Sequence, residues 1–127
     1  MKTKTIYFLL GFFLISSGCK KNGLWKEIDC SIGNTYQVTH DLSFSINSIN
    51  DSRCPEGAMC FWAGDVYLYI NIFHSNTETD TTMYLRNTSR NPIQIADYIF
   101  KVLDVNPISG GTTTSKDVTI KMLVTKN

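Results

Sequence analysis

The chain has 127 residues, of which 43% are hydrophobic and 18% are charged, and its formal net charge is +1. This length accommodates one domain, and no run of five like charges occurs anywhere in the sequence. The basic stripe typical of nucleic-acid-binding proteins is therefore missing, and we expect no nucleic acid among the partners.

The first 18 residues are organised like an export signal. A short basic segment, residues 1–5, precedes an apolar segment, residues 6–15, and the small residues Ser16, Ser17 and Gly18 follow. An apolar segment of this length, rising about 1.5 Å per residue, spans only half of a hydrocarbon core of about 30 Å, which excludes a stable transmembrane helix. Residues 1–18 are therefore predicted to be a cleaved signal peptide.

Cys19 directly follows these small residues, and the junction resembles a bacterial lipobox, in which this cysteine is acylated, for example with palmitate, and becomes the first mature residue. Several acyl chains on one terminus anchor a protein stably to a membrane. The resemblance therefore implies a protein of the cell envelope whose first partner is a bacterial membrane, expected to be the outer one. Ser16 stands where leucine is commonest, and the alternative is ordinary cleavage near Ser17, which leaves Cys19 as a plain thiol.

Residues 19–34 are interpreted as the lipidated N-terminus and a tether, and residues 35–127 as the folded domain. In the domain, apolar and polar residues alternate with period two, as Leu42, Phe44 and Ile46 do with their polar neighbours. Turn-rich stretches at 50–52, 75–80, 87–92 and 109–116 separate these runs. The pattern predicts an all-β fold, a single antiparallel β-sandwich of about seven strands over residues 35–38, 42–47, 66–73, 82–86, 93–95, 98–105 and 118–125.

Cys54 and Cys60 are expected to form a disulfide, because an exported protein meets oxidising conditions and a turn brings the two thiols together. Pro55 and Gly57 suit the second and fourth positions of a type I turn that starts at Cys54. Cys30 is then either a buried free thiol or a competing partner for one of the two.

The sequence predicts no metal site, and no cofactor is expected. A zinc site formed by Cys30, Cys54 and Cys60 with His40 or His74 fits no common spacing of paired ligands. A calcium site at Asp51, Glu56 and Asp65 lacks the dense ligand spacing of a dedicated loop.

Residues 51–64 read DSRCPEGAMCFWAG and resemble the DSRCP-x4-C-x-WAG signature of small lipoproteins of Bacteroidetes-type bacteria. The likeness extends over about residues 42–126, through the strand that follows the motif to the last strand. It implies a compact β domain in a lipoprotein of unknown function, and it supplies no catalytic residues.

The same loop has two interpretations. In the first it is a structural corner, where Trp62 covers the disulfide, Gly64 permits a bend and Arg53 pairs with a nearby carboxylate of Asp51, Glu56 or Asp65. In the second it is a recognition loop presented on a rigid turn by Arg53, Glu56, Met59, Phe61 and Trp62.

Tyr67, Tyr69 and Phe73 share one face of the strand at 66–73, and the opposite face is also apolar. One explanation is that the tether with Trp25 covers this aromatic row. The other is an exposed aromatic patch that binds a glycan or another envelope protein.

No catalytic setting is recognised in the sequence, which contains neither a G-x-S-x-G elbow nor another activated nucleophile. We therefore expect an envelope-anchored lipoprotein with a non-enzymatic binding or structural role. One alternative is a protein ligand or protease inhibitor that acts through the Cys54–Cys60 loop, which requires Met59 and Phe61 to project outward. The other is a hydrolase using His40 or His74, which requires a histidine in a cleft beside a carboxylate and a nucleophile.

Overall fold

The computed structural model describes residues 18, 23–55, 57–108 and 110–127, so most of the predicted signal peptide and Cys19 lie outside the described residues. The described part contains nine strands and no helix. The strands are β1 Trp25–Ser31, β2 Thr35–Thr39, β3 Leu42–Asp51, β4 Val66–His74, β5 Thr77–Tyr84, β6 Ile93–Ile95, β7 Tyr98–Asn106, β8 Gly111–Thr113 and β9 Thr119–Lys126.

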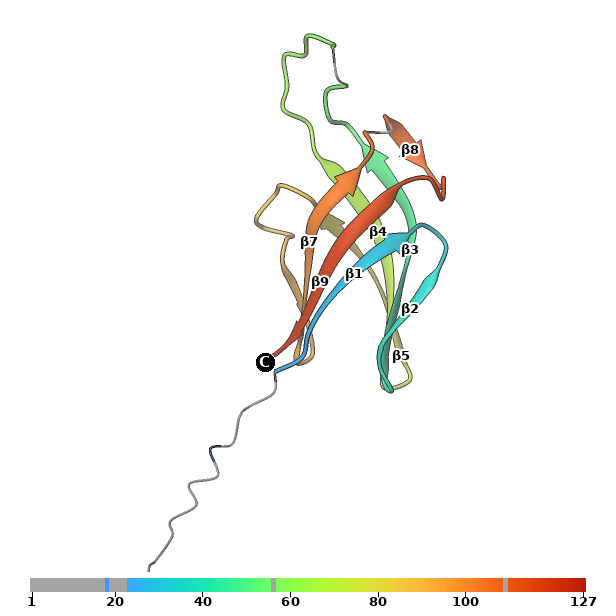
Figure 1. Ribbon diagram of the computed structural model, residues 1–127, viewed down its shortest axis with the longest axis vertical. Helices are drawn as coiled ribbons and strands as arrows, with labels where there is room; N and C mark the ends of the chain where they lie inside the picture. Colours follow the sequence, from blue (N-terminus) through green and yellow to red (C-terminus); the bar gives the residue numbers. More distant parts are fainter. Residues whose placement is uncertain (1–17, 19–22, 56, 109) are drawn as a thin grey trace, which may run out of the picture.

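The strands form two antiparallel sheets that pack face to face (Figure 1). One sheet has the order β1-β9-β7-β6, and the other has the order β2-β3-β4-β5 with β8 paired to β3. Fully buried side chains from both sheets fill the space between them, and Phe44 on β3 meets Phe100 on β7 edge to face at 5.7 Å. Burial of one such ring stabilises the fold by about 1.5–3 kcal/mol. The predicted all-β sandwich is confirmed.

The period-two pattern explains which strands could be predicted from the sequence. On β3 the side chains of Leu42, Phe44 and Ile46 are buried while the intervening serines lie on the outer side. Alternation of this kind places one face of a strand in the core and the other toward water. The strands β3, β4, β7 and β9 all follow it, and their observed bounds lie close to the expected ones.

The segment interpreted as a tether differs from that expectation. From Trp25 onward the chain is strand β1, which pairs with β9 from Trp25↔Thr125 to Ser31↔Thr119. Cys30 and the following Ile32 are buried in the core, while the Trp25 side chain is exposed. The folded domain therefore begins by Trp25 and not at Thr35.

The stretch at 75–80 also differs from the predicted turn. Only Ser75 and Asn76 connect β4 to β5, and their φ angles are 48° and 64°. Two successive left-handed residues form the hairpin turn that matches the twist of paired strands. Residues 77–80 consequently belong to β5, which places Glu78 and Asp80 on the sheet.

The two ends of the sandwich carry different features (Figure 1). At one end the chain enters β1 beside the C-terminus, where Lys126 N donates to Leu24 O at 3.1 Å. At the opposite end the β3–β4 loop extends beyond the sheets (Figure 1). The loop is therefore directed away from the point where the N-terminal segment joins the domain.

Candidate functional site

The β3–β4 loop, residues 52–65, is closed by a disulfide between Cys54 and Cys60, whose Cα atoms lie 5.8 Å apart. The predicted pairing is confirmed, but its turn is displaced by one residue. Ala58 N donates to Pro55 O at 3.2 Å, so the turn begins at Pro55 and not at Cys54. Gly57 then has a φ of 78°, a conformation that glycine adopts without steric cost.

A buried ion pair holds the base of the loop. Arg53 Nε and Nη2 donate to Asp51 Oδ1 and Oδ2 at 2.9 and 2.7 Å, and Arg53 Nη1 donates to the Val105 carbonyl at 2.8 Å. The Arg53 and Asp51 side chains are only 7% and 0% exposed. Arg53 therefore lies beneath the recognition surface to which sequence assigned it, and it joins the loop to the end of β7.

The two sides of the loop are also joined directly. Ser52 N donates to Asp65 O at 2.9 Å, and Asp65 N donates to Ser52 Oγ at 3.0 Å. Gly64 lies so close that a Cβ there would stand 2.1 Å from Ser52 O, and its φ is 62°. Only glycine fits this position, which agrees with the bend expected from sequence.

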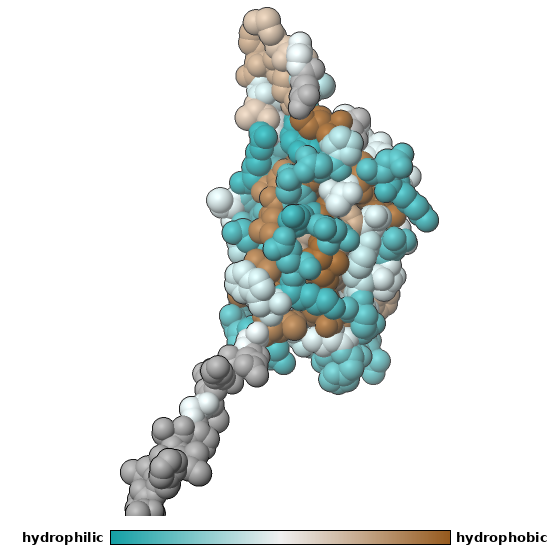
Figure 2. Space-filling view, viewed as in Figure 1, coloured by the Kyte–Doolittle hydropathy of each residue, from teal (hydrophilic) through white to brown (hydrophobic). Residues whose placement is uncertain are grey.

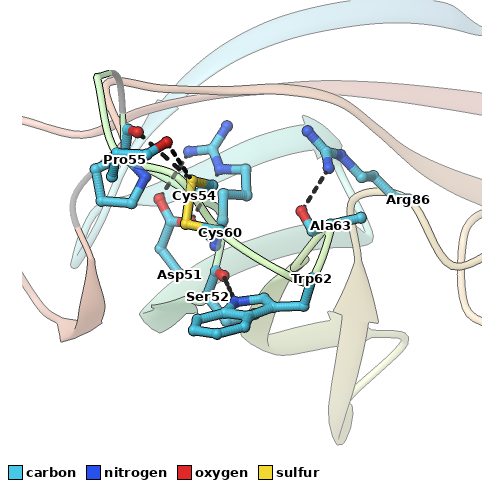
Figure 3. Close-up of a disulfide and its surroundings, with 10 residues drawn as sticks. Asp51, Ser52, Cys54, Pro55, Cys60, Trp62, Ala63 and Arg86 are labelled. Carbon is cyan, nitrogen blue, oxygen red and sulfur yellow. Dashed lines mark hydrogen bonds and ion pairs between the residues drawn. A yellow bond between two sulfur atoms is a disulfide. The ribbon is translucent and has the colours of Figure 1, made fainter.

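Trp62 lies along the flank of the loop beside Ser52 (Figure 3). Its Nε1 donates to Ser52 O at 3.2 Å, and Arg86 Nη1 donates to the neighbouring Ala63 O at 2.9 Å. The indole is nevertheless 62% exposed. Trp62 thus has one edge fixed to the loop and one face open to solvent.

Met59 and Phe61 project from the end of the loop, and both side chains are fully exposed. With Trp62 they form the apolar tip, the name used below for these three residues. Figure 2 shows the loop as a tan and white protrusion above a body whose surface is teal and white with brown patches between. Sequence also assigned Glu56 to this surface, but Glu56 lies outside the described residues.

A cleft of about 700 Å³ lies at the base of the loop. Its walls come from the loop, from the segment after β7 and from the start of β9, with the lining residues Arg53, Pro55, Asn106, Pro107, Ile108, Asp117 and Thr119. The one cation in this lining, the Arg53 guanidinium, already donates to Asp51 and Val105. The cleft therefore adds concave surface at the base of the loop, and the charged groups in its lining are the engaged Arg53 guanidinium and the Asp117 carboxylate.

The cysteines do not assemble a zinc site. Cys54 and Cys60 are joined to each other, and Cys30 is a free thiol inside the core. Burial, with a smaller effect of Asp29, raises the pKa of the Cys30 thiol to about 12. Within residues 18, 23–55, 57–108 and 110–127, no group of three histidine, cysteine or acidic side chains is placed to hold a metal ion.

Two of the three carboxylates considered for calcium have other partners, and the third, Glu56, lies outside the described residues. Asp51 is bonded to Arg53, and Asp65 Oδ1 and Oδ2 accept hydrogen bonds from the backbone of Arg86 and Asn87 at 2.9 and 3.0 Å. These contacts make both carboxylates part of the loop's framework.

Both histidines lie near Asp41, at the end of the sandwich away from the loop. His74 Nε2 is 3.5 Å from Asp41 Oδ2, and His40 Nδ1 is 3.8 Å from Asp41 Oδ1. The Thr39 hydroxyl donates to Asp41 Oδ1 at 2.6 Å and is the main reason why the pKa of that carboxyl lies below its usual range. A hollow of about 400 Å³ adjoins them, but no hydroxyl in the described part of the chain is hydrogen-bonded to either imidazole.

The aromatic row is not covered by Trp25, which lies in the other sheet, so that explanation is wrong. Tyr67 packs edge to face against Tyr84 at 4.7 Å and is half-buried. Tyr69 and Phe73, farther along β4, remain exposed. The row therefore separates into one structural and two accessible rings.

Comparison with protein-family models, curated proteins and solved structures finds no match to this chain. The resemblance to small lipoproteins therefore stays a prediction. Among the residues that the structure describes, no helix is long and apolar enough to span a membrane.

Proposed function

We propose that this chain is a lipid-anchored, non-enzymatic binding module of the bacterial cell envelope that engages another envelope protein through the apolar tip. The observation that carries the proposal is the full exposure of Met59 and Phe61 on a loop closed by a disulfide. Lipidation at Cys19 and location in the envelope rest on the sequence of the first 19 residues.

Exposing apolar side chains such as these to water is unfavourable for the isolated chain. Burying a phenylalanine or methionine side chain against a partner stabilises by about 1.5–3 kcal/mol. Met59, Phe61 and Trp62 lie within four residues of one loop, and exposed apolar side chains gathered in this way mark interaction sites in soluble domains. The tip also combines a tryptophan, which is frequent among interface hot spots, with a methionine, which adapts its shape to a pocket.

The framework of the loop favours tight binding. The disulfide, the buried Arg53–Asp51 pair and the bonds between Ser52 and Asp65 each restrict the loop before any partner arrives. A restricted loop loses less conformational entropy on binding than a mobile one. The convex tip is therefore suited to a concave apolar pocket, such as the specificity pocket of an envelope protease.

A protein partner fits the tip better than a lipid surface does. Residues 57–63, GAMCFWA, carry no charge, and Arg53 and Arg86 are both engaged with the loop itself. Attraction to anionic membranes depends on basic side chains near the lipid headgroups. The tip also lies at the opposite end of the domain from the start of β1, so an anchor preceding β1 would direct it away from its own membrane (Figure 1).

A photo-activated cross-linking amino acid at position 61 tests the proposal in bacteria that express the full chain. We expect a discrete protein adduct, identified by mass spectrometry, that is lost when Met59 and Trp62 are both changed to serine. The same amino acid at Lys101, exposed on β7, is the matched control and should give no such adduct.

Adducts with lipid alone, or the same adducts from positions 61 and 101, would contradict a protein partner for the tip. Circular dichroism of Phe61→Ser should match that of the wild type, because the Phe61 side chain makes no buried contact.

A further inference from the structure

A second surface, separate from the loop, lies on the outer side of the five-stranded sheet. Strand alternation directs Tyr69, Asn71 and Phe73 of β4 to this side. The hairpin register sets Asp80 opposite Asn71 and Glu78 opposite Phe73. We call this surface the outer face and define it by Asn47, Tyr69, Asn71, Phe73, Glu78 and Asp80.

The two accessible rings stand at either end of a polar centre. Tyr69 and Phe73 are 44% and 42% exposed. Four residues along a strand separate them by about 13 Å. The two rings thus offer apolar surfaces with polar groups between them, and only an extended ligand could contact both across about 13 Å.

Asn71 organises the polar centre. Its Nδ2 donates to Glu78 Oε1 and to Asp80 Oδ1, the latter at 2.6 Å. The residue is 7% exposed, and among the described residues its Oδ1 finds no hydrogen-bond partner. A buried amide oxygen without a donor is rare in native proteins. The oxygen itself has almost no exposed area, so a ligand would reach this polar centre through the exposed carboxylates of Glu78 and Asp80, which Asn71 holds in place on the sheet.

A β-bulge brings a further amide to the same surface. The β3–β4 register shifts between Ile46 and Ser48, which makes Asn47 the extra, exposed residue. Asn47, Tyr69, Asp80 and Thr82 line a shallow hollow of about 280 Å³. Bulges redirect side chains and are frequent beside binding sites.

A second hollow continues from the other ring. It has a volume of about 400 Å³, and Phe73 lines it together with Gln37, Ser43 and Asn76. The hollow at Tyr69 and the hollow at Phe73 therefore lie on one sheet face. Both are bordered by amide and hydroxyl side chains, together with Asp80 in the first and His40 and Asp41 in the second.

We infer that the outer face binds a neutral carbohydrate chain. A sugar ring has an apolar C–H face that stacks on Tyr69 or Phe73, and hydroxyls that donate to the carboxylates of the polar centre. Nucleic acids and anionic polymers are disfavoured because Glu78 and Asp80 would repel them. A flat apolar protein surface is disfavoured because it would desolvate two carboxylates without supplying donors.

The inference does not depend on the apolar tip. It is tested with the full chain, purified in detergent, by calorimetric titration with cellohexaose, xylohexaose, mannohexaose and chitohexaose. We expect saturable binding of at least one of them. Tyr69→Ala and Phe73→Ala should each weaken it at least tenfold, while Tyr69→Phe, which keeps the ring, should stay within about threefold of the wild type.

Phe61→Ser is the matched control, because it removes an exposed aromatic ring from the tip and should leave the carbohydrate affinity unchanged. Circular dichroism of each variant checks the fold. The inference is overturned if none of the four oligosaccharides binds at millimolar concentration, or if Tyr69→Ala leaves binding intact. Binding of dextran sulfate in preference to all four would overturn it as well.

Discussion

The buried pair of Arg53 and Asp51 provides the most direct test of how the loop is held. Arg53→Met keeps much of the side-chain volume and removes the charge, which leaves the Asp51 carboxylate in a site with 0% side-chain exposure and without its guanidinium. Breaking a buried pair by removing one partner costs about 3–5 kcal/mol. A small domain has a total stability of about 5–15 kcal/mol, so this loss is a large fraction of it.

The assays are thermal unfolding and urea unfolding, each followed by circular dichroism and by tryptophan fluorescence, with Trp62 reporting on the loop. We expect the melting temperature of Arg53→Met to fall by at least about 12 °C, taking about 4 °C per kcal/mol for a domain of this size. Arg53→Lys should be intermediate, because lysine keeps the charge but cannot donate to both carboxylate oxygens in the same fork.

The double variant Asp51→Ala with Arg53→Met is the matched control. It leaves neither charge buried, so it should recover part of the stability lost in Arg53→Met. The reasoning is refuted if Arg53→Met unfolds within about 1 kcal/mol of the wild type, the scale of an ordinary surface change.

The remaining predictions concern the cysteines and Asp41. Changing both Cys54 and Cys60 to serine should cost about 2 kcal/mol in urea unfolding, because the disulfide closes a short loop, and a loss above about 5 kcal/mol would contradict this. Cys30 should resist iodoacetamide at neutral pH in the folded protein and react after unfolding, because its pKa of about 12 keeps the thiol protonated. Cys19→Ala should abolish fatty-acid labelling and partition into detergent, and an unlabelled wild type would count against the anchor. Thr39→Val should raise the pKa of Asp41 toward its usual value in an NMR titration, because the lowering arises chiefly from the Thr39 hydroxyl. The stability that comes from this lowered pKa is present at neutral pH and is lost as the pH falls through the pKa of Asp41 in the folded protein.

Sequence predicts the strands that bury one face of regular alternation. In β3 and β4, apolar residues at every second position leave one register compatible with a core. The sequence does not reveal β1 clearly, because Lys26 stands on the same side of the strand as Ile28 and Cys30 and leaves only a short apolar series. Pairing with β9 decides that segment, and pairing partners are not written in local periodicity.

The sequence predicts the aromatic residues of the outer face but not its acidic residues, for a related reason. Tyr69 and Phe73 were found because aromatic residues stand out on a strand. Glu78 and Asp80 were missed because the run from Ser75 to Asp80 has the composition of a loop. The signal was the two-residue turn at Ser75-Asn76, which fixes the register and thereby carries both acids onto the face of Asn71.

The burial and the partner of Arg53 could not be predicted from residue type alone. An arginine beside a cysteine loop is expected at the surface, since arginine is seldom buried without a partner. The sequence offers three nearby carboxylates as partners for Arg53, those of Asp51, Glu56 and Asp65. In the structure Arg53 pairs with Asp51. The selection depends on the carbonyl of Val105, which lies 52 residues away in the chain and accepts from the same guanidinium. Long-range backbone acceptors of this kind are fixed only by the fold.

The positions of the two proposed surfaces have a consequence for how they work together. With Cys19 acylated, residues 19–24 can extend by at most about 20 Å, so the domain stays close to its membrane. The apolar tip then lies at the far end of the sandwich, and the outer face lies along its side (Figure 1). A protein at the tip and a carbohydrate chain on the sheet would not compete for the same residues. Tyr69→Ala should therefore leave the position-61 cross-link intact, and Phe61→Ser should leave carbohydrate binding intact, which makes the two proposals separable in one set of variants.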